Sequence, residues 1–334
     1  MVWRAIAILC LGAGAAHADC QSGEVELLFH HDAPAIGHPK GEAAGLLASF
    51  VNSELDGRAC MTVVADAPGY SDSTVLEGLA EGRYNMAAPA MGNLGNISER
   101  FLIFDLPFMF RDLSVVFEYH DGKLGRELLR DAEEDGLLGL AYWTDGMKAL
   151  SANRAVELPA DFEGLTFGTQ DALIEQFYFR EMGAETETIE LANLADALSE
   201  GIVDGQNTTW TNISARGLAL DHEQIVESNH GLVQYMVVTD PIFWNGLDAD
   251  LRADLELLIE IVAQERNRFA FELANIAKRE ALSDGIEIAT LDEEEYRTWR
   301  LAMQSTWLHF GGVIGFDQIS AVTFANQRAR EIVD

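Results

Sequence analysis

Basic residues and catalytic signatures are both scarce in this sequence. Its 22 lysines and arginines face 55 aspartates and glutamates, which gives a formal charge of −33 over 334 residues. Such a charge repels nucleic acid and anionic lipid, and no basic patch offsets it. The Gly-x-Ser-x-Gly motif, a glycine-rich phosphate loop and the spacings of zinc ligands are absent as well. We therefore expect no nucleic-acid partner and find no recognisable catalytic motif.

Long apolar runs are absent from the body of the chain, and one short run lies at the N-terminus. It follows Arg4 and ends in Ala16-His17-Ala18, which has the small-x-small form of a signal-peptidase site. The run is short for a membrane span, and Asp19 disfavours lipid modification of Cys20. We expect residues 1–18 to be a signal peptide that is removed on export to the periplasm.

Cysteine is rare. Cys10 leaves with the signal peptide, so the exported chain keeps only Cys20 and Cys60. Each lies just before a predicted strand, at 25–30 and 61–65, and an even pair of cysteines in an oxidising compartment favours a disulfide. We expect a Cys20–Cys60 bridge, with two buried free thiols as the alternative.

Two stretches of the chain share a helix-glycine-strand pattern. In Leu79–Pro89 and Leu198–Trp210 a helical run ends on Glu-Gly, and a short polar residue then leads into an extended segment. Glycine after the last turn favours the left-handed C-cap, and the next residues favour a buried parallel strand. We expect two similar α/β lobes rather than one large sheet. Because ligands bind beyond the carboxyl ends of such strands, residues 88–90 and 206–210 should face a common cleft.

The first half of the chain begins with a βαβ pattern. A strand at 24–31 precedes an amphipathic helix at 41–55 and a strand at 61–65. A buried strand at 137–143 then predicts the end of the first lobe, where the chain should cross into the second.

The longest helical pattern covers residues 248–282, and no proline or glycine interrupts it. At 1.5 Å per residue it would span roughly 50 Å, longer than either lobe, so it should bridge both. We expect residues 19–146 plus 234–270 to form the first lobe and residues 147–233 plus 271–334 to form the second.

Five motifs follow one another across nearly the whole chain. They are FDLPFMF (104–110), AYWTDG (141–146), LPADFEGLTF (158–167), ALSEGIVDGQ (197–206) and SNH (228–230), the last followed by a strand and Phe-Trp. In this order they resemble the DctP-type solute-binding proteins of tripartite ATP-independent periplasmic (TRAP) transporters. The resemblance implies an α/β, two-lobe periplasmic-binding-protein fold with a long lobe-bridging helix. It also implies a receptor without a cofactor, which closes on a small organic acid and delivers it to membrane permease subunits.

Four positions depart from the family pattern. Gly168 stands where the family usually has an arginine that grips the ligand carboxylate, and Lys148 stands at a second arginine position. Thr208-Thr209 replaces an asparagine-proline pair. A lysine is a point charge and cannot replace a bidentate guanidinium. We therefore expect a monocarboxylate, a zwitterion or a polar neutral solute rather than a dicarboxylate.

Five candidate ligand contacts lie around the expected cleft. Lys148 can place a cation there, unless it is an ordinary surface lysine. Gln170 and Asp171 follow a strand and can donate and accept hydrogen bonds, although Asp171 equally suits a helix N-cap. Asn207 and Thr208 follow the second glycine pattern and complete this group.

Three further candidates are aromatic or imidazole side chains. Tyr70 and Trp210 can stack on a ligand, although aromatic residues near a junction often belong to the core. His31 matches a ligand-contacting family position, with a satisfied buried histidine as the alternative. It cannot share a metal with His30, because adjacent side chains on a strand point to opposite faces, so we expect no metal site. An exported α/β enzyme acting on a small polar substrate is the alternative function.

Overall fold

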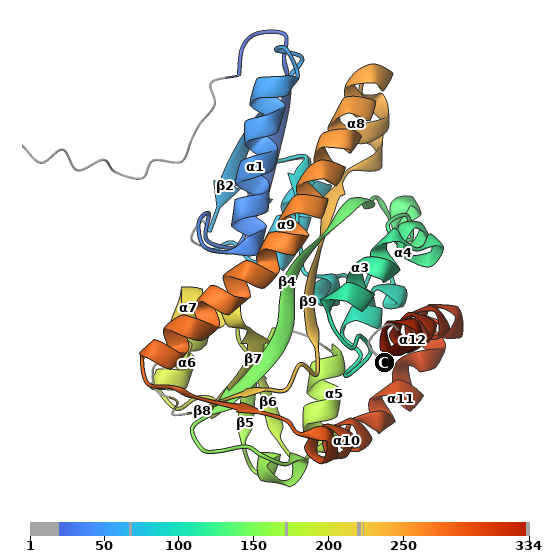
Figure 1. Cartoon of the computed structure of the whole chain (residues 1–334). Coiled ribbons are helices and arrows are strands. Elements are labelled where there is room, and N and C mark those ends of the chain that lie inside the picture. Colours follow the sequence, from blue (N-terminus) through green and yellow to red (C-terminus); the bar gives the residue numbers. More distant parts are fainter. Residues whose placement is uncertain (1–19, 67–68, 171–172, 219–221, 223, 332–334) are drawn as a thin grey trace, which may run out of the picture.

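The strands of the molecule pair along one continuous path that runs through two lobes (Figure 1). The computed structural model describes residues 20–66, 69–170, 173–218, 222 and 224–331. Within those ranges no helix is both long enough and apolar enough to cross a membrane. The expected signal peptide and Asp171 lie outside the described residues.

The first lobe is built on the predicted βαβ unit. Strand β1 (Val25–His31) pairs in parallel with β2 (Ala59–Ala65) on one side and with β3 (Met86–Ala87) on the other. Strand β9 (Leu232–Thr239) is antiparallel to β3 and to β4 (Leu138–Ala152). The order β2-β1-β3-β9-β4 places the ends of β1 and β3 beside the crossing between the lobes.

Helix α1 (Pro39–Glu54) covers one face of this sheet. The side chain of His38 accepts a hydrogen bond from the amide of Lys40, and proline occupies the first turn, so the helix has a defined start. Leu47 and Val51 are buried in the core between the sheet and the long helix. Burial of this apolar stripe holds the helix in place.

Strand β4 belongs to both lobes. The predicted end of this strand at Trp143 was wrong, because its next residues pair with β9 up to Met147 and then with β7 (Gly205–Thr209). The β4–β9 register shifts between Thr144 and Gly146, which marks a bulge at the crossing. The two lobes therefore share one strand path instead of having separate sheets.

The second lobe repeats the strand-helix alternation. Strand β5 lies between β6 and β7, with both neighbours parallel to it, and β8 joins β4 to β10. The remaining elements of this lobe are β5 (Thr166–Thr169), β6 (Glu185–Thr188), β8 (Gln224–Glu227), β10 (Glu287–Thr290), α5 (Leu173–Glu181), α6 (Leu194–Ser199) and α7 (Trp210–Arg216).

Helix α9 (Ala249–Ser283) bridges the lobes, as its uninterrupted pattern predicts. It has 35 residues and crosses the molecule diagonally in Figure 1. Its first half packs Leu255 and Val262 into the first core, and its second half packs Ala277 and Ala281 beside α7 in the second lobe.

Short helices and the C-terminal helices complete the fold. Gly311 and Gly312 both lie inside α11, and the chain turns at Gly315, where φ is +103°. The segment 101–110 is buried in the largest core cluster. The elements are α2 (Asp72–Ala80), η1 (Met91–Leu94), η2 (Glu99–Phe104), α3 (Leu113–Asp121), α4 (Lys123–Leu128), η3 (Glu133–Asp135), η4 (Pro159–Phe162), η5 (Leu191–Asn193), α8 (Pro241–Gly246), α10 (Glu293–Ala302), α11 (Gln304–Ile314) and α12 (Phe316–Glu331).

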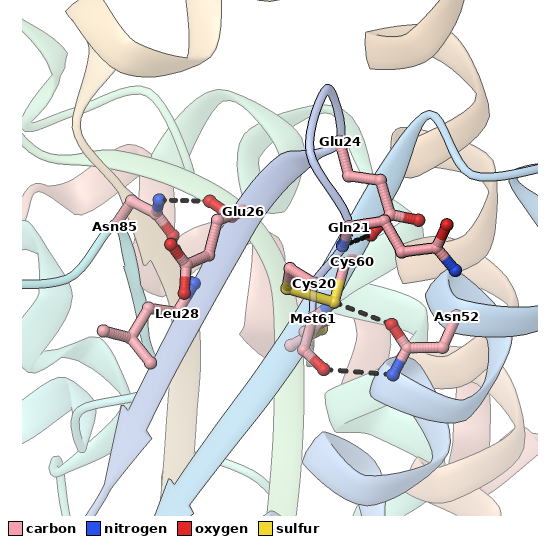
Figure 2. The surroundings of a disulfide bond; sticks show 9 residues. All are labelled: Cys20, Gln21, Glu24, Glu26, Leu28, Asn52, Cys60, Met61 and Asn85. Carbon is pink, nitrogen blue, oxygen red and sulfur yellow. Dashed lines mark hydrogen bonds between the residues drawn. A yellow bond between two sulfur atoms is a disulfide. The ribbon is translucent and has the colours of Figure 1, made fainter. Parts of the chain in front are cut away.

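The predicted disulfide is present. Cys20 and Cys60 are bonded, with their Cα atoms 5.4 Å apart, and the bridge ties the segment before β1 to β2 (Figure 2). Beside it, Asn52 of α1 accepts from the amide of Met61 (2.7 Å) and donates to its carbonyl (3.0 Å). Both cysteines and Glu24 form the only set of three close metal-ligand atoms among the described residues, and the disulfide occupies both sulfurs.

Candidate ligand-binding cleft

A small cavity lies where the two lobes meet. Its volume is about 50 Å³, which is room for a few water molecules. Both stretches that were expected to face a common cleft reach it: Ala90 from residues 88–90, and Asn207 and Thr208 from residues 206–210. The full lining is Ala90, Gly92, Asn93, Asp105, Lys148, Gly168, Gln170, Glu175, Leu194, Asn207, Thr208, Leu232, Val233 and Gln234.

Lys148 lies on β4 and is a buried lysine rather than a surface one. Only 6% of its surface is exposed, and its ammonium forms an ion pair with Glu175 of α5. A Cβ atom on Gly231 would lie 2.9 Å from Lys148 Cδ, so glycine at that position makes room for the lysine stem. Burial lowers the pKa of Lys148, and the nearby carboxylate of Asp105 opposes this effect.

Asp105 is a cavity residue that we did not predict. It follows η2 and is 9% exposed, and burial raises its pKa to about 6, while Lys148 opposes the rise. Its carboxylate lies against Gly92, where a Cβ atom would come within 2.7 Å of Oδ2. The sequence did carry a signal, because Asp105 is the one charged residue in the apolar run 101–110.

A chain of buried polar groups fixes the orientation of Asn207. Its Nδ2 donates to Tyr178 Oη (2.7 Å), which in turn lies 3.4 Å from His230 Nε2, and His230 Nδ1 lies 2.6 Å from Ser228 Oγ. Burial lowers the pKa of His230 to about 3, so this imidazole is neutral and can accept from the tyrosine hydroxyl. Asn207 Oδ1 is left buried without a hydrogen-bond partner among the described residues.

Gly168 leaves little space for a larger residue. A Cβ atom at this position would lie 2.5 Å from Leu194 Cδ1, so the leucine of α6 occupies the place where the family resemblance puts an arginine stem. Both residues line the cavity, and Lys148 is the one cationic side chain in its described lining.

The eight residues predicted to contact a ligand divide into three groups. Lys148, Gln170, Asn207 and Thr208 line the cavity, whereas Asp171 lies outside the described residues. His31, Tyr70 and Trp210 are not in the described lining.

Each of the last three has other contacts. His31 is 1% exposed and its Nδ1 accepts from the amide of Ala33 at 3.3 Å. The ring of Tyr70 packs beside His30, with ring centroids 5.2 Å apart. Trp210 packs with Ile213 and Ile225 in a core cluster of the second lobe.

A second buried charged cluster lies directly behind the cavity wall. Lys40 of α1 is 2% exposed, and its Nζ contacts Asp32 at 2.6 Å and Asp72 at 3.6 Å and lies 4.0 Å from the centre of the Tyr235 ring. Burial lowers the pKa of Lys40, but the surrounding carboxylates outweigh that effect and raise it. The positive charge of Lys40 is therefore balanced by carboxylates of the protein itself.

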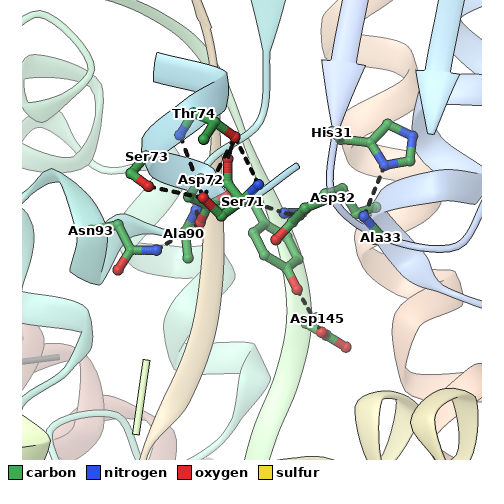
Figure 3. Close-up of polar contacts among 12 residues, drawn as sticks. His31, Asp32, Ala33, Ser71, Asp72, Ser73, Thr74, Ala90, Asn93 and Asp145 are labelled. Atoms are coloured by element: carbon green, nitrogen blue, oxygen red, sulfur yellow. Dashed lines mark hydrogen bonds and ion pairs between the residues drawn. The ribbon is translucent and has the colours of Figure 1, made fainter. Parts of the chain in front are cut away.

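Asp72 connects that cluster to the cavity. Its Oδ2 accepts from the amide of Ala90 (2.6 Å) and from Asn93 Nδ2 (2.8 Å), and Ala90 and Asn93 both line the cavity (Figure 3). The start of α2 therefore positions the cavity wall in the first lobe.

Asp145 of β4 joins the two lobes. It is fully buried and accepts from Tyr235 Oη (2.8 Å) and from Asn212 Nδ2 (3.2 Å), while His38 Nε2 of the first lobe lies 3.4 Å away. Burial raises the pKa of Asp145, but His38 and the hydrogen bonds lower it below its ordinary value. The Asp145 carboxylate at the crossing is therefore ionised, and groups of the protein supply its hydrogen-bond donors.

The sequence matches a known protein family across most of its length. Residues 29–311 match the model of the bacterial extracellular solute-binding protein family 7, DctP. The chain belongs to this family. The resemblance carried by the five motifs is confirmed.

Solute-binding proteins with named ligands are similar to most of the chain. The C4-dicarboxylate-binding periplasmic protein DctP of Vibrio cholerae is 35% identical over 326 residues, which cover 97% of this chain and 98% of the relative. A TRAP periplasmic solute-binding protein of Shewanella oneidensis with bound succinate has a TM-score of 0.87 at 30% identity, covering 91% of this chain and 99% of that one. One from Pseudomonas aeruginosa with bound L-malate has a TM-score of 0.82 at 30% identity, covering 85% and 99%.

These comparisons decide between the function classes. The relatives are periplasmic solute receptors, and the same two-lobe fold with its bridging helix is present here. This DctP-family chain is a periplasmic binding protein and not an exported enzyme.

Proposed function

We propose that this chain is the periplasmic receptor of a TRAP transporter, which captures a small organic acid in the cavity between its lobes and delivers it to the membrane permease subunits. The observation that carries the proposal is the bonding of Lys148. A lysine ammonium has three N–H donors, and Glu175 takes one of them. The other two have no partner among the described residues, and a ligand carboxylate can accept both.

Ligand entry requires the lobes to separate. The cavity has room for only a few waters and is lined by residues of both lobes. The bulge between Thr144 and Gly146 on β4, next to Gln234 on β9, is the natural hinge because pairing is already interrupted there. Asn267 of α9 contacts the same point, since its Oδ1 accepts from the Thr144 amide at 2.8 Å. Ligand-dependent compaction in small-angle scattering tests this movement.

A dicarboxylate is not favoured as the ligand. Succinate and L-malate are bound by proteins similar to this chain. Here, however, Gly168 and the close packing of Leu194 leave Lys148 as the one described cation for a carboxylate. A second ligand carboxylate would be buried without a charged partner, which is costly.

Thermal-shift and calorimetric titrations of refolded, ligand-free protein test the proposal with a panel of small organic acids. We expect saturable stabilisation by at least one acid, with no loss of that acid on incubation. The double substitution Lys148→Met with Glu175→Gln removes both buried charges at similar volume and should abolish binding. Lys123→Met alters an exposed lysine and should leave binding unchanged. If no acid binds and no small molecule co-purifies with the protein, the receptor function is refuted.

A further inference from the structure

We propose that the preferred ligand is an amino acid or a related zwitterion, whose carboxylate binds Lys148 and whose N–H donors bind Asp105 and Asn207. This inference rests on the proposed function, because it concerns the same cavity. It assigns Asp105 as the residue that selects the ligand.

Asp105 differs from the other buried acids of the described chain. Four acidic residues are buried there, and three of them receive hydrogen bonds or ion pairs: Asp72 from Ala90 and Asn93, Asp145 from Tyr235 and Asn212, and Glu175 from Lys148. No described residue donates to Asp105 or pairs with it. A carboxylate with little access to bulk water needs hydrogen-bond donors. The missing donor of Asp105 can come from a ligand, because its carboxylate lines the cavity.

Asn207 supplies a second acceptor with the same need. Asn207 Nδ2 donates to the Tyr178 oxygen, and the neutral His230 can accept from the hydroxyl of the same tyrosine. This direction of bonding leaves Asn207 Oδ1 as the free atom of the amide, and it is buried without a described partner. Two unsatisfied acceptors from opposite lobes therefore line one cavity, and both require N–H or O–H donors.

The balance of charge separates the ligand classes. Counted by their formal charges, the Lys148 ammonium and the carboxylates of Glu175 and Asp105 in the cavity lining sum to one negative charge. A bound zwitterion leaves this total unchanged. A monocarboxylate brings the total to two negative charges, and a dicarboxylate brings it to three. Buried like charges repel one another strongly, and so the zwitterion is the organic acid that the cavity accommodates best.

Matched sets of ligands test the inference directly. One set is 4-aminobutanoate, butanoate and succinate, which share a four-carbon chain and differ at one end. A second is L-proline with cyclopentanecarboxylate, and a third is 3-aminopropanoate with propanoate and malonate. We expect the amino member of at least one set to bind roughly ten-fold or more tightly than its partners, the value of a hydrogen bond to a charged group. The fully N-methylated, quaternary form of that ligand keeps the charge but has no N–H, and it should bind more weakly.

Two variants connect the preference to Asp105. Asp105→Asn keeps the shape of the side chain and should weaken the amino ligand roughly 10- to 100-fold. Asp135→Asn changes an exposed aspartate without a side-chain partner among the described residues and should have no effect. Affinity of the wild type for the amino ligand should rise between about pH 5 and pH 7, as Asp105 ionises, and this rise should vanish in Asp105→Asn.

Mass spectrometry of small molecules that co-purify with the protein provides an independent readout. A co-purified acid with an N–H group supports the inference, and one without any N–H overturns it. The inference is also overturned if the member without an amino group binds best in every set. The same holds if the Asp105→Asn variant still prefers the amino ligand over its partners by the same factor as the wild type. These results would leave the receptor function standing, whereas the absence of binding by every acid together with the absence of any co-purified small molecule refutes both.

Discussion

Replacing Asp105 with asparagine should make the ligand-free protein more stable, even though it impairs the proposed site. The folded protein buries this carboxylate without a hydrogen-bond donor from any described residue, and burial raises its pKa from 3.8 to about 6. In the unfolded chain the same group is solvated and ionises at its ordinary pKa. Ionisation therefore favours the unfolded state, and a neutral amide of the same shape removes that penalty.

The size of the effect follows from the two pKa values. Between about pH 4 and pH 6 the unfolded chain has lost the proton and the folded chain still holds it, so stability from this group falls as pH rises. One pKa unit corresponds to about 1.4 kcal/mol. Asp105→Asn should therefore stabilise by about 3 kcal/mol near pH 7.5 but by only about 1 kcal/mol near pH 4.5.

Urea unfolding of the two proteins at both pH values measures this difference. Subtracting the wild-type curve removes the contributions of other titrating groups, such as His120 and His230, whose pKa values burial lowers to about 3. Asp135→Asn, the exposed control, should change the free energy of unfolding at neither pH. A stabilisation by Asp105→Asn that is the same at both pH values, or a loss of stability near pH 7.5, would refute the reasoning.

Other parts of the structure lead to further predictions. Replacing both Cys20 and Cys60 with serine should cost about 4 kcal/mol by the loop-entropy model, measured by denaturant unfolding, and an unchanged midpoint would contradict this. Gly168→Arg should lower the melting temperature, because the arginine side chain would clash with Leu194. Adding Leu194→Ala should restore stability and allow the double variant to bind succinate. If calorimetry shows no succinate binding by the double variant, space at this position does not limit the choice of ligand. Arg216→Ala should increase the radius of gyration of the ligand-free protein in small-angle scattering, because the Arg216 guanidinium bonds from α7 to Asp32 and Asp66 of the first lobe. An unchanged radius of gyration would mean that other contacts hold the lobes together.

Features that depend on local sequence could be predicted well. Helix α9 follows from an unbroken apolar stripe between Asp248 and Gly285, and the disulfide follows from two cysteines that each precede a strand. Lys148 and Asn207 could be placed at the cleft because each lies next to a motif or glycine pattern. These positions need no knowledge of which distant segments pack together.

Features that depend on pairing between distant segments could not be predicted. The length of β4 depends on β9 and β7, which are far away in the sequence, so its second half resembled a loop. Asp105 was missed because acidic residues are abundant in this chain, and only the folded structure shows which of them lacks a partner. Trp210 is aromatic and close to the cleft in sequence, yet its ring packs into the core beside α9.

The scarcity of lysine helps to distinguish the binding residue from a structural one. The sequence has four lysines, and two of them, Lys40 and Lys148, are buried near the junction of the lobes. Lys40 contacts two carboxylates and the face of Tyr235, so its charge is satisfied inside the protein and it can hold α1 and α2 together without a ligand. Lys148 has one described carboxylate partner and lines a cavity. Because an incompletely paired buried ammonium is costly, its retention at this position is best explained by an anionic ligand group that completes the pairing.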